Sequence, residues 1–269
     1  KFIIYELENG HGGFITLTHH IISDAATIAL MGTEVIDIYK KLLKNENIDA
    51  KDYSYEEYIQ SEKEYLNSSK FETDKKYWNE LYSTVPEVAS VPSTSFNNSM
   101  VLTGKSKRKE FIIEEELLNK IADFCKENKV SNFNFFMSIY AIYLSRVSNL
   151  KDFVIGTPIL NRTNFVEKHT TGMFINTAPL RICLDDNLDF KSFVKKICQS
   201  SFDLLRHQKY PYELLLKNLR NKESGLPALF DVILSYQITK ANDGNSEVPY
   251  EVEWVPTSTI SNGIDIHLH

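Results

Sequence analysis

The stretch THHIISDAAT, residues 18–27, decides how this sequence is interpreted. It overlaps the end of an alternating, β-branched run at residues 13–18 (GFITLT), which predicts a strand that leads into two adjacent histidines. Asp24 is placed to cap a helix that starts just after it. These residues alone leave three interpretations open: a metal site, a histidine that works in acyl transfer, and two polar residues that simply end a strand.

The geometry of a strand disfavours the metal site. Neighbouring side chains on a strand point to opposite faces, so His19 and His20 cannot easily bind one ion. The sequence has no HExxH motif, and we expect no metal. An imidazole can accept a proton from an attacking amine or alcohol near neutral pH, so acyl transfer stays open. Because no GxSxG motif is present, such a catalyst would promote direct attack on a bound thioester, without an acyl-enzyme.

Composition narrows the possible partners. The chain has 269 residues and a formal net charge of −6, so it is a poor candidate for binding nucleic acid. No apolar run reaches the roughly 18 residues that cross a bilayer, and we expect no membrane association. The three cysteines are widely spaced and form no CxxC pair, which is typical of a protein in the reducing cytoplasm.

The hydrophobic pattern predicts a mixture of helices and strands. Helices are expected from just after Asp24 to about residue 43, at residues 54–66, 72–83, 114–127, 131–148 and 190–206, and after Pro211. Strands are expected at residues 1–6, 13–18, 108–113, 153–158, 178–184, 229–237, 248–254 and 263–269. A segment rich in Pro, Ser, Thr and Asn, from Pro86 to Gly104, is the best linker candidate. We therefore expect an α/β fold with one lobe at residues 1–90, a linker at 91–106 and a second lobe at 107–269.

Residues 19–25 (HHIISDA) resemble the HHxxxDG signature of condensation domains of nonribosomal peptide synthetases, a branch of the chloramphenicol-acetyltransferase-like superfamily. Later segments resemble the same family in the same order, over nearly the whole chain. These segments are YSYEEY at 53–58, YW at 77–78, GTPILNR at 156–162, TGMFINT at 171–177, HQKYPYE at 207–213 and FDV at 230–232. The resemblance implies two acetyltransferase-like lobes in a V arrangement, with a channel between them.

The resemblance also implies roles for the residues of the motif. The candidate catalytic residues are His20, His19 and Asp24. His20 would be the active-site residue, whereas His19 and Asp24 would be structural. Asp24 would pair with Arg162 across the interface between the lobes, and breaking such a pair would leave a charge buried and unpaired.

The implied reaction is the formation of an amide bond by aminolysis of a carrier-bound thioester. A donor acyl or peptidyl thioester and an acceptor aminoacyl thioester would meet at His20, each on the 4′-phosphopantetheine arm of a carrier protein. The enzyme would thus be an acyltransferase that binds no cofactor of its own, and its partners would be carrier proteins and an adjacent adenylation domain. Holding two tethered substrates in one channel would remove most of the entropic cost of their encounter.

Some features depart from the family pattern. Ala25 stands where the family has glycine, which costs little if the backbone there has ordinary helical angles. Gly172 and Asn176 would lie near the floor of the channel. The chain resembles a fragment that lacks the N-terminal segment and the extreme C-terminus, with an incomplete N-terminal lobe, and such a fragment could be inactive.

Three functions remain as alternatives to a peptide-bond-forming condensation domain. They are an epimerisation domain, a non-catalytic docking module for carrier or tailoring proteins, and a stand-alone acyltransferase.

Overall fold

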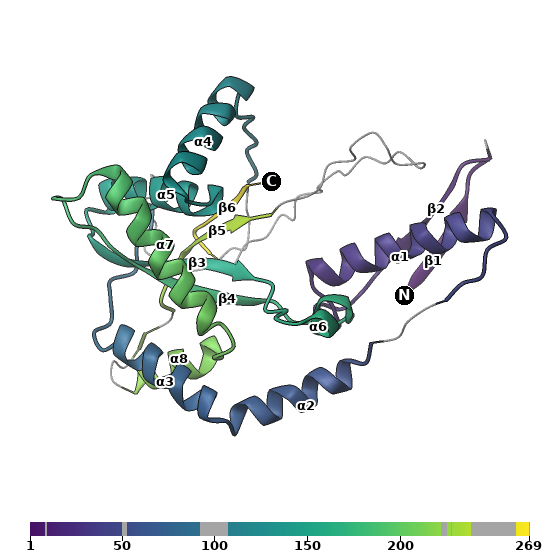
Figure 1. Ribbon diagram of the computed structural model, residues 1–269, viewed down its shortest axis with the longest axis horizontal. Helices are drawn as coiled ribbons and strands as arrows, with labels where there is room; N and C mark the ends of the chain where they lie inside the picture. The colour runs from purple at the N-terminus through teal and green to yellow at the C-terminus, as the bar shows by residue number, and fades with distance from the viewer. Residues whose placement is uncertain are drawn as a thin grey trace. The chain divides into compact units, whose positions relative to one another are not determined.

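The computed structural model describes residues 1–8, 10–49, 53–91, 107–221, 225–226, 228–237 and 262–268. These residues form two compact units, each assembled from two stretches of the chain (Figure 1). The first unit contains Lys1–Thr73 and Ile159–Asn176, and the second contains Asp74–Pro158 and Thr177–His269. The expected linker at 91–106 lies outside the described residues except at its first residue, and the proposed lobe boundaries stay a prediction.

The first unit begins with a β-hairpin. Strand β1 (Phe2–Glu6) pairs antiparallel with β2 (Gly12–Thr16). The chain then forms the short 3-10 helix η1 (His20–Ile22), α1 (Ala25–Leu43) and α2 (Tyr55–Leu66), and the later stretch adds α6 (Phe165–His169). The strand expected at residues 13–18 therefore ends at Thr16, and the two histidines do not lie on it.

The second unit is a four-stranded sheet with helices. Its strands are β3 (Asp152–Ile159), β4 (Asn176–Cys183), β5 (Val232–Tyr236) and β6 (Ile264–Leu268), in the order β4-β3-β5-β6. Strand β5 runs parallel to both β3 and β6. The helices are α3 (Ser69–Leu81), which starts in the first unit, α4 (Glu115–Asn128), α5 (Asn132–Ser148), α7 (Phe190–Arg206) and α8 (Tyr212–Arg220).

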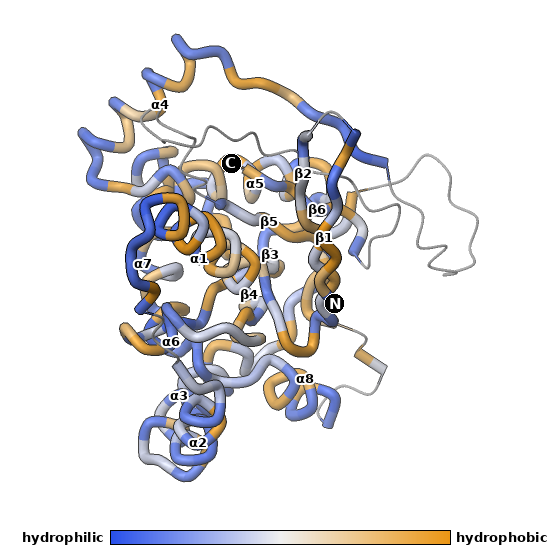
Figure 2. Tube along the Cα trace, turned by 90° about the vertical axis from the view of Figure 1, so that its right-hand side faces the viewer, coloured by the Kyte–Doolittle hydropathy of each residue, from blue (hydrophilic) through white to orange (hydrophobic). Residues whose placement is uncertain are grey.

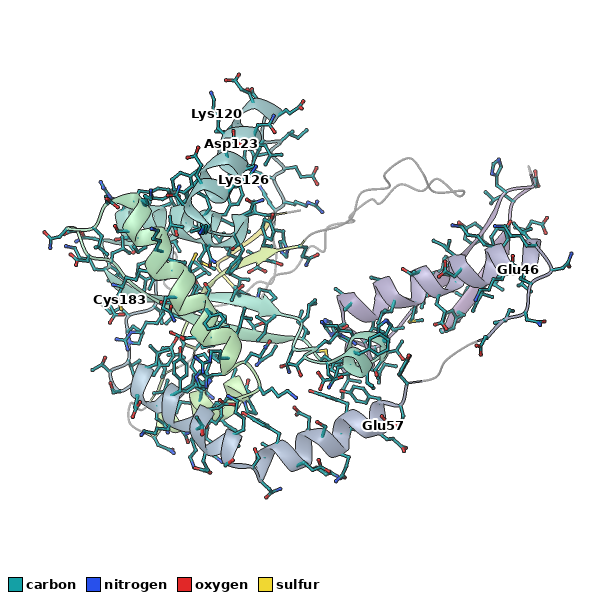
Figure 3. The ribbon with its side chains drawn as sticks, in the orientation of Figure 1. Glu46, Glu57, Lys120, Asp123, Lys126 and Cys183 are labelled. Carbon is teal, nitrogen blue, oxygen red and sulfur yellow. The ribbon has the colours of Figure 1, made fainter. Side chains whose placement is uncertain are left out.

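The core of the second unit forms where α5 and α7 pack together beside the sheet (Figure 1). The inner strand β3 is buried along most of its length, where the apolar residues Phe153, Val154 and Ile155 lie. Hydrophilic and hydrophobic residues alternate along α7, which buries one face (Figure 2). Helix α4 buries Ile121 and Cys125, while Lys120, Asp123 and Lys126 project from its outer side (Figure 3).

The HQKYPYE segment ties α3 into the second unit. The Trp78 indole Nε1 donates a hydrogen bond of 3.0 Å to the backbone oxygen of His207. The His207 Nδ1 atom lies 2.5 Å from a carboxylate oxygen of the fully buried Asp74, and the ring of Tyr77 stacks on the imidazole at 4.0 Å between centroids. The YW and HQ segments, far apart in sequence, therefore form one structural cluster.

The structure corrects one expected strand and leaves another untested. Residues 107–114, where a strand was expected at 108–113, form no regular element, and Phe111 and Ile112 are 85% and 96% exposed. The β-branched and aromatic sequence favours a strand, but no described neighbour offers the hydrogen bonds of a ladder. The expected strand at 248–254 lies outside the described residues. Among the described helices, none combines the length and hydropathy that crossing a bilayer requires.

Gly156 on β3 leaves space for an aromatic ring. A Cβ atom at this position would lie 2.5 Å from Cε2 of Phe230, which itself packs on the ring of Tyr212. We therefore expect Gly156→Ala to lower the free energy of unfolding by about 1–3 kcal/mol, as overpacked cores do. Urea denaturation of the purified chain measures this loss.

A double-mutant cycle provides the control. In a Phe230→Leu background the added methyl group meets a smaller side chain, so Gly156→Ala should cost clearly less than in the wild type. An equal cost in both backgrounds would show that the backbone, and not the ring of Phe230, requires the glycine.

Candidate active site

The two histidines of the motif differ in their local environment. His19 has an extended backbone and caps η1, and its Nδ1 accepts a hydrogen bond of 3.1 Å from the backbone N–H of Ile21. This bond places the proton of a neutral His19 ring on Nε2. His20 is the first residue of η1 and is exposed, and within the described residues its imidazole makes no hydrogen bond. His20 therefore has both ring nitrogens available.

Ser23 and Asp24 hold the chain directly after η1. The buried Ser23 donates a hydrogen bond of 3.0 Å to the hydroxyl of Thr18, across the histidine pair. Asp24 caps α1, and its Oδ1 accepts from the N–H of Thr27 at 2.8 Å. The histidine segment is thus fixed at both of its ends by short polar contacts.

Asp24 and Arg162 form a buried ion pair. Their side chains are 1% and 3% exposed, and Nη2 of Arg162 lies 3.0 and 3.2 Å from the two carboxylate oxygens. Oδ2 of Asp24 also accepts hydrogen bonds from the backbone N–H groups of Phe174 (3.0 Å) and Ile175 (3.3 Å). The pair that the resemblance implied is present, but both residues belong to the first compact unit.

The remaining contacts of Arg162 anchor the loop that follows β3. Its Nη1 donates to the backbone oxygens of Glu167 and Thr170, both at 2.5 Å. The guanidinium carbon lies 3.9 Å from the centre of the Phe174 ring, within the range of a cation–π interaction. Its Nε has no hydrogen-bond partner among the described residues. One guanidinium therefore joins the start of α1 to several points along residues 167–174.

Thr27 is a connecting residue that the sequence analysis missed. Its buried Oγ1 donates to the backbone oxygen of Gly172 at 2.7 Å and accepts from the Gly172 N–H at 2.9 Å. It also lies 3.1 Å from Nη2 of Arg162. A hydroxyl in the first turn after an aspartate cap is the only signal in the sequence, and such residues often bond locally instead.

Gly172 has a steric reason to lack a side chain. A Cβ atom there would lie 2.2 Å from the ring of Tyr55, whose hydroxyl donates to the backbone oxygen of Met173 at 2.7 Å. Tyr55 also contacts the ring of Phe174 edge-on. The sequence analysis included Tyr55 only as part of a similar segment and assigned it no role.

The other two candidate residues each begin a regular element. Ala25 is the exposed first residue of α1, and its φ is not positive. Alanine in place of the family glycine therefore introduces no backbone strain. Asn176 is the half-buried first residue of β4. Within the described residues, no group of three or more His, Cys, Asp or Glu side chains is arranged to hold a metal ion.

The ion pair makes stability depend on pH. Burial alone would raise the pKa of Asp24, but the N–H donors of Thr27 and Phe174 and the charge of Arg162 outweigh it and lower the pKa below its usual value. A carboxylate with a lowered pKa in the folded state stabilises the fold above its unfolded pKa of about 3.9. This contribution is lost as the pH falls through the folded-state pKa.

We expect Asp24→Asn to lower the free energy of unfolding by about 3–5 kcal/mol near neutral pH, because it leaves Arg162 buried without its counter-charge. The difference from the wild type should start to shrink below about pH 4, where the unfolded wild-type carboxylate becomes protonated, and should be lost once the pH has fallen through the lowered folded-state pKa. Urea denaturation over a pH series measures both effects. The double variant Asp24→Asn/Arg162→Met should lose less than the two single losses added together, and strict additivity would contradict the coupling.

Thr27 can be tested by a matched pair of variants. Thr27→Val removes the hydroxyl that joins Gly172 and Arg162 and should lower the free energy of unfolding by about 1–3 kcal/mol. Thr27→Ser keeps the hydroxyl and loses one methyl group, at a cost of about 1 kcal/mol or less. Chemical denaturation compares the two, and a Val variant as stable as the Ser variant would rule out the hydrogen-bonding role.

A family model described as "Condensation domain" matches residues 1–262 of the chain. The chain is 35% identical over its whole length to part of surfactin synthase subunit 1 from Bacillus subtilis (strain 168), and 33% identical over 88% of its length to part of a plipastatin synthase from the same strain. It covers only 7% and 9% of these two relatives.

Solved structures show the same fold. The first condensation domain of the calcium-dependent antibiotic synthetase matches with a TM-score of 0.70 and 20% identity, over 89% of this chain and 52% of that one. The starter condensation domain of rhizomide synthetase matches with a TM-score of 0.69 and 25% identity, over 81% and 48%. These matches confirm the expected α/β fold class, while the V arrangement of the lobes stays a prediction. The chain belongs to the condensation-domain family of nonribosomal peptide synthetases, as its ordered motifs predicted.

Proposed function

We propose that the condensation domain to which this chain belongs forms an amide bond between a donor acyl or peptidyl thioester and an acceptor aminoacyl thioester. His20 is the residue at the reacting atoms. Both substrates are carried on the 4′-phosphopantetheine arms of carrier proteins, and an adenylation domain lies in the same synthetase. The domain itself holds no cofactor, and the protein works in the cytoplasm.

The contrast between the two histidines carries this proposal. The Nδ1 of His19 is occupied by the N–H of Ile21, so this ring serves the local structure. The exposed imidazole of His20 makes no hydrogen bond within the described residues and can meet a substrate. Its neighbours Ser23 and Asp24 hold the backbone on its C-terminal side through buried contacts. A free imidazole on a fixed segment has the properties required of a group that acts on a bound substrate.

The proposed step is a direct displacement. The nitrogen lone pair of the acceptor amine attacks the thioester carbonyl carbon, and the C–N bond forms as the carbonyl electrons move to oxygen. The tetrahedral intermediate then collapses and breaks the C–S bond. The ring nitrogen of His20 takes the proton that the amine loses, and the leaving thiolate takes up a proton, so the products are an amide and a free thiol.

Residues 167–175 contribute to the same site by fixing its framework. Through Arg162 and Asp24, the loop is joined to the start of α1 and so to the histidine segment. Asp24 is a positioning residue in this proposal, because its two oxygens are fully engaged by Arg162 and backbone N–H groups. Arg162, Gly172 and Asn176 support the site, and Ala25 is tolerated because it needs no positive φ.

The experiment compares His20→Ala with His19→Ala in the full-length synthetase, with donor and acceptor carrier proteins loaded. His20→Ala should lower the rate of condensation product formation by about 10²–10⁴-fold, the usual contribution of a general acid or base. His19→Ala should act more weakly, because it removes one capping bond worth about 0.5–2 kcal/mol. Mass spectrometry of the carrier-bound product gives the rates.

The outcomes separate the competing functions. A His20→Ala variant as active as the wild type would eliminate the catalytic assignment. If the wild type itself forms no amide product, the non-catalytic docking module is favoured. If it changes only the stereochemistry of the donor residue, the epimerisation alternative holds. Circular dichroism melts of both variants show whether a lost activity reflects lost structure.

A further inference from the structure

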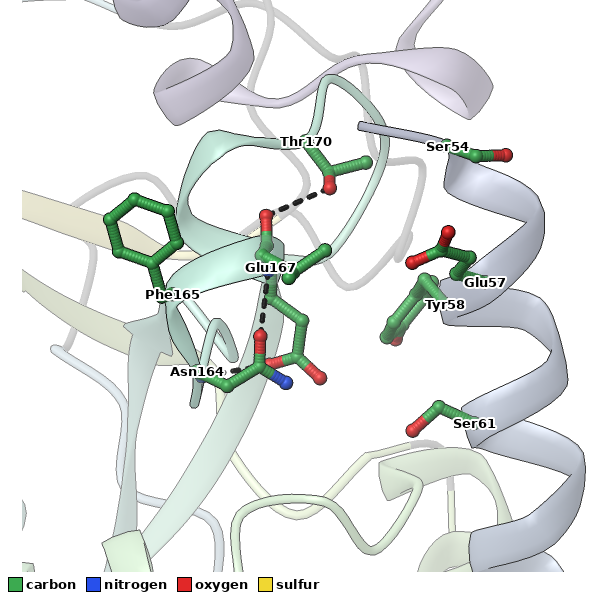
Figure 4. A pocket seen from close by; sticks show the side chains of 9 residues that line it. Ser54, Glu57, Tyr58, Ser61, Asn164, Phe165, Glu167 and Thr170 are labelled. Atoms are coloured by element: carbon green, nitrogen blue, oxygen red, sulfur yellow. Dashed lines mark hydrogen bonds between the residues drawn. The ribbon is translucent and has the colours of Figure 1, made fainter. Parts of the chain in front are cut away.

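A pocket of about 380 Å³ lies within the first compact unit, between α2 and α6 (Figure 4). Neither histidine of the candidate active site lines it, although Glu167 and Thr170, whose backbone oxygens accept from Arg162, do. Its size is at the small end of the range for ligand-binding pockets, which is roughly 300–1,000 Å³. It therefore suits a small molecule or a single side chain.

One wall is a face of α2. Glu57, Tyr58 and Ser61 extend from this helix toward α6, at the spacing that places residues on one side of a helix (Figure 4). The ring of Tyr58 packs against Phe174, with 4.2 Å between the ring centres. This contact with Phe174 holds the Tyr58 ring in place in the wall of the pocket.

The opposite wall is rigid because its polar groups are already bonded. Asn164 caps α6 and its side-chain oxygen accepts from the N–H of Glu167 at 2.8 Å, while the Glu167 carboxylate accepts from the backbone N–H of Asn164 at 3.3 Å. Glu167 is only 3% exposed. Val166 adds an aliphatic side chain to the lining of the pocket.

The electrostatic field in this pocket is negative. Its lining includes two carboxylates, those of Glu57 and Glu167, and no lysine, arginine or histidine. Burial raises the pKa of Tyr58, and the negative charges of Glu62 and Glu167 raise it further. Among the described residues, Glu57 has no ion-pair partner, and it projects from the N-terminal half of α2 (Figure 3). An incoming cation would therefore meet a free carboxylate.

We propose that this pocket binds a primary alkylammonium group about as long as a lysine side chain, with the ammonium paired to Glu57. The alkyl part lies between the Tyr58 ring and Val166, and the hydroxyl of Ser61 accepts a further N–H from the ammonium. The electron-rich face of Tyr58 adds to the attraction for a cation. The group can belong to a small amine or to a lysine of a polypeptide, since both present the same chemistry.

The test titrates the purified chain with n-butylammonium, and with 1-butanol as a neutral probe of the same length, by isothermal calorimetry or NMR. We expect saturable binding of the amine that weakens as salt is added, and weaker binding of the alcohol. Glu57→Gln should weaken amine binding by about threefold to tenfold, because it removes one charge-assisted contact. Glu56→Gln, an exposed neighbour on α2 that does not line the pocket, is the matched control and should bind like the wild type.

A second probe, N-acetyl-lysine methylamide, distinguishes the two sources of the ammonium. Binding that matches n-butylammonium supports a peptide-borne lysine, whereas binding of the free amine alone supports a small molecule. The proposal is overturned if n-butylammonium does not bind saturably, if 1-butanol binds equally well, or if Glu56→Gln weakens binding as much as Glu57→Gln. Thermal melts of both variants confirm that the helix is intact.

Discussion

The buried ion pair between Asp24 and Arg162 is the constraint on which the first compact unit depends. Removing two charges from water costs several kcal/mol per ion, and a good arrangement of partners must offset this cost. Here the carboxylate receives the guanidinium and three backbone N–H groups, while the guanidinium also donates to three backbone carbonyl oxygens. The number and direction of these contacts specify one placement of the loop against the start of α1.

Within the part of the chain that the structure describes, the Asp24–Arg162 network is the main buried contact of α1. The helix buries only one residue fully, Thr27, and that residue is itself part of the hydrogen-bond network. Exposed apolar side chains such as Ile28 and Leu42 contribute little burial in the structure. The N-terminal turn of α1 is therefore placed by hydrogen bonds and charge, which are directional, and not by apolar packing, which is not. Directional contacts hold a segment in one orientation, which apolar packing alone does not.

The sequence predicted the longer helices well, because amphipathic spacing and caps are local signals, but it did not predict the short helix α6. Asp189 and Ser131 cap α7 and α5 as expected, and the expected and observed bounds of α7 coincide. The prediction of a strand at 108–113 was wrong. Its residues favour a β-sheet, but a strand forms only beside a second strand, which the local sequence does not specify. The histidines were placed on a strand because alternation ran up to them, whereas a side-chain cap by His19 turns the chain into η1.

At the site, the charged residues were easier to predict than the ones that orient them. The Asp24–Arg162 pair was implied by the family resemblance of two motifs, whereas Thr27 and Tyr55 act through contacts that no local pattern encodes. Both converge on the backbone at 172–173, where Gly172 leaves room for the Tyr55 ring and Thr27 binds both backbone groups of the glycine. A side chain at 172 would displace the ring, and with it the loop that delivers N–H groups to Asp24. Gly172 thus helps to fix the histidine segment indirectly, through Thr27 and the loop that binds Asp24. No described hydrogen bond joins Gly172 to His19 or His20.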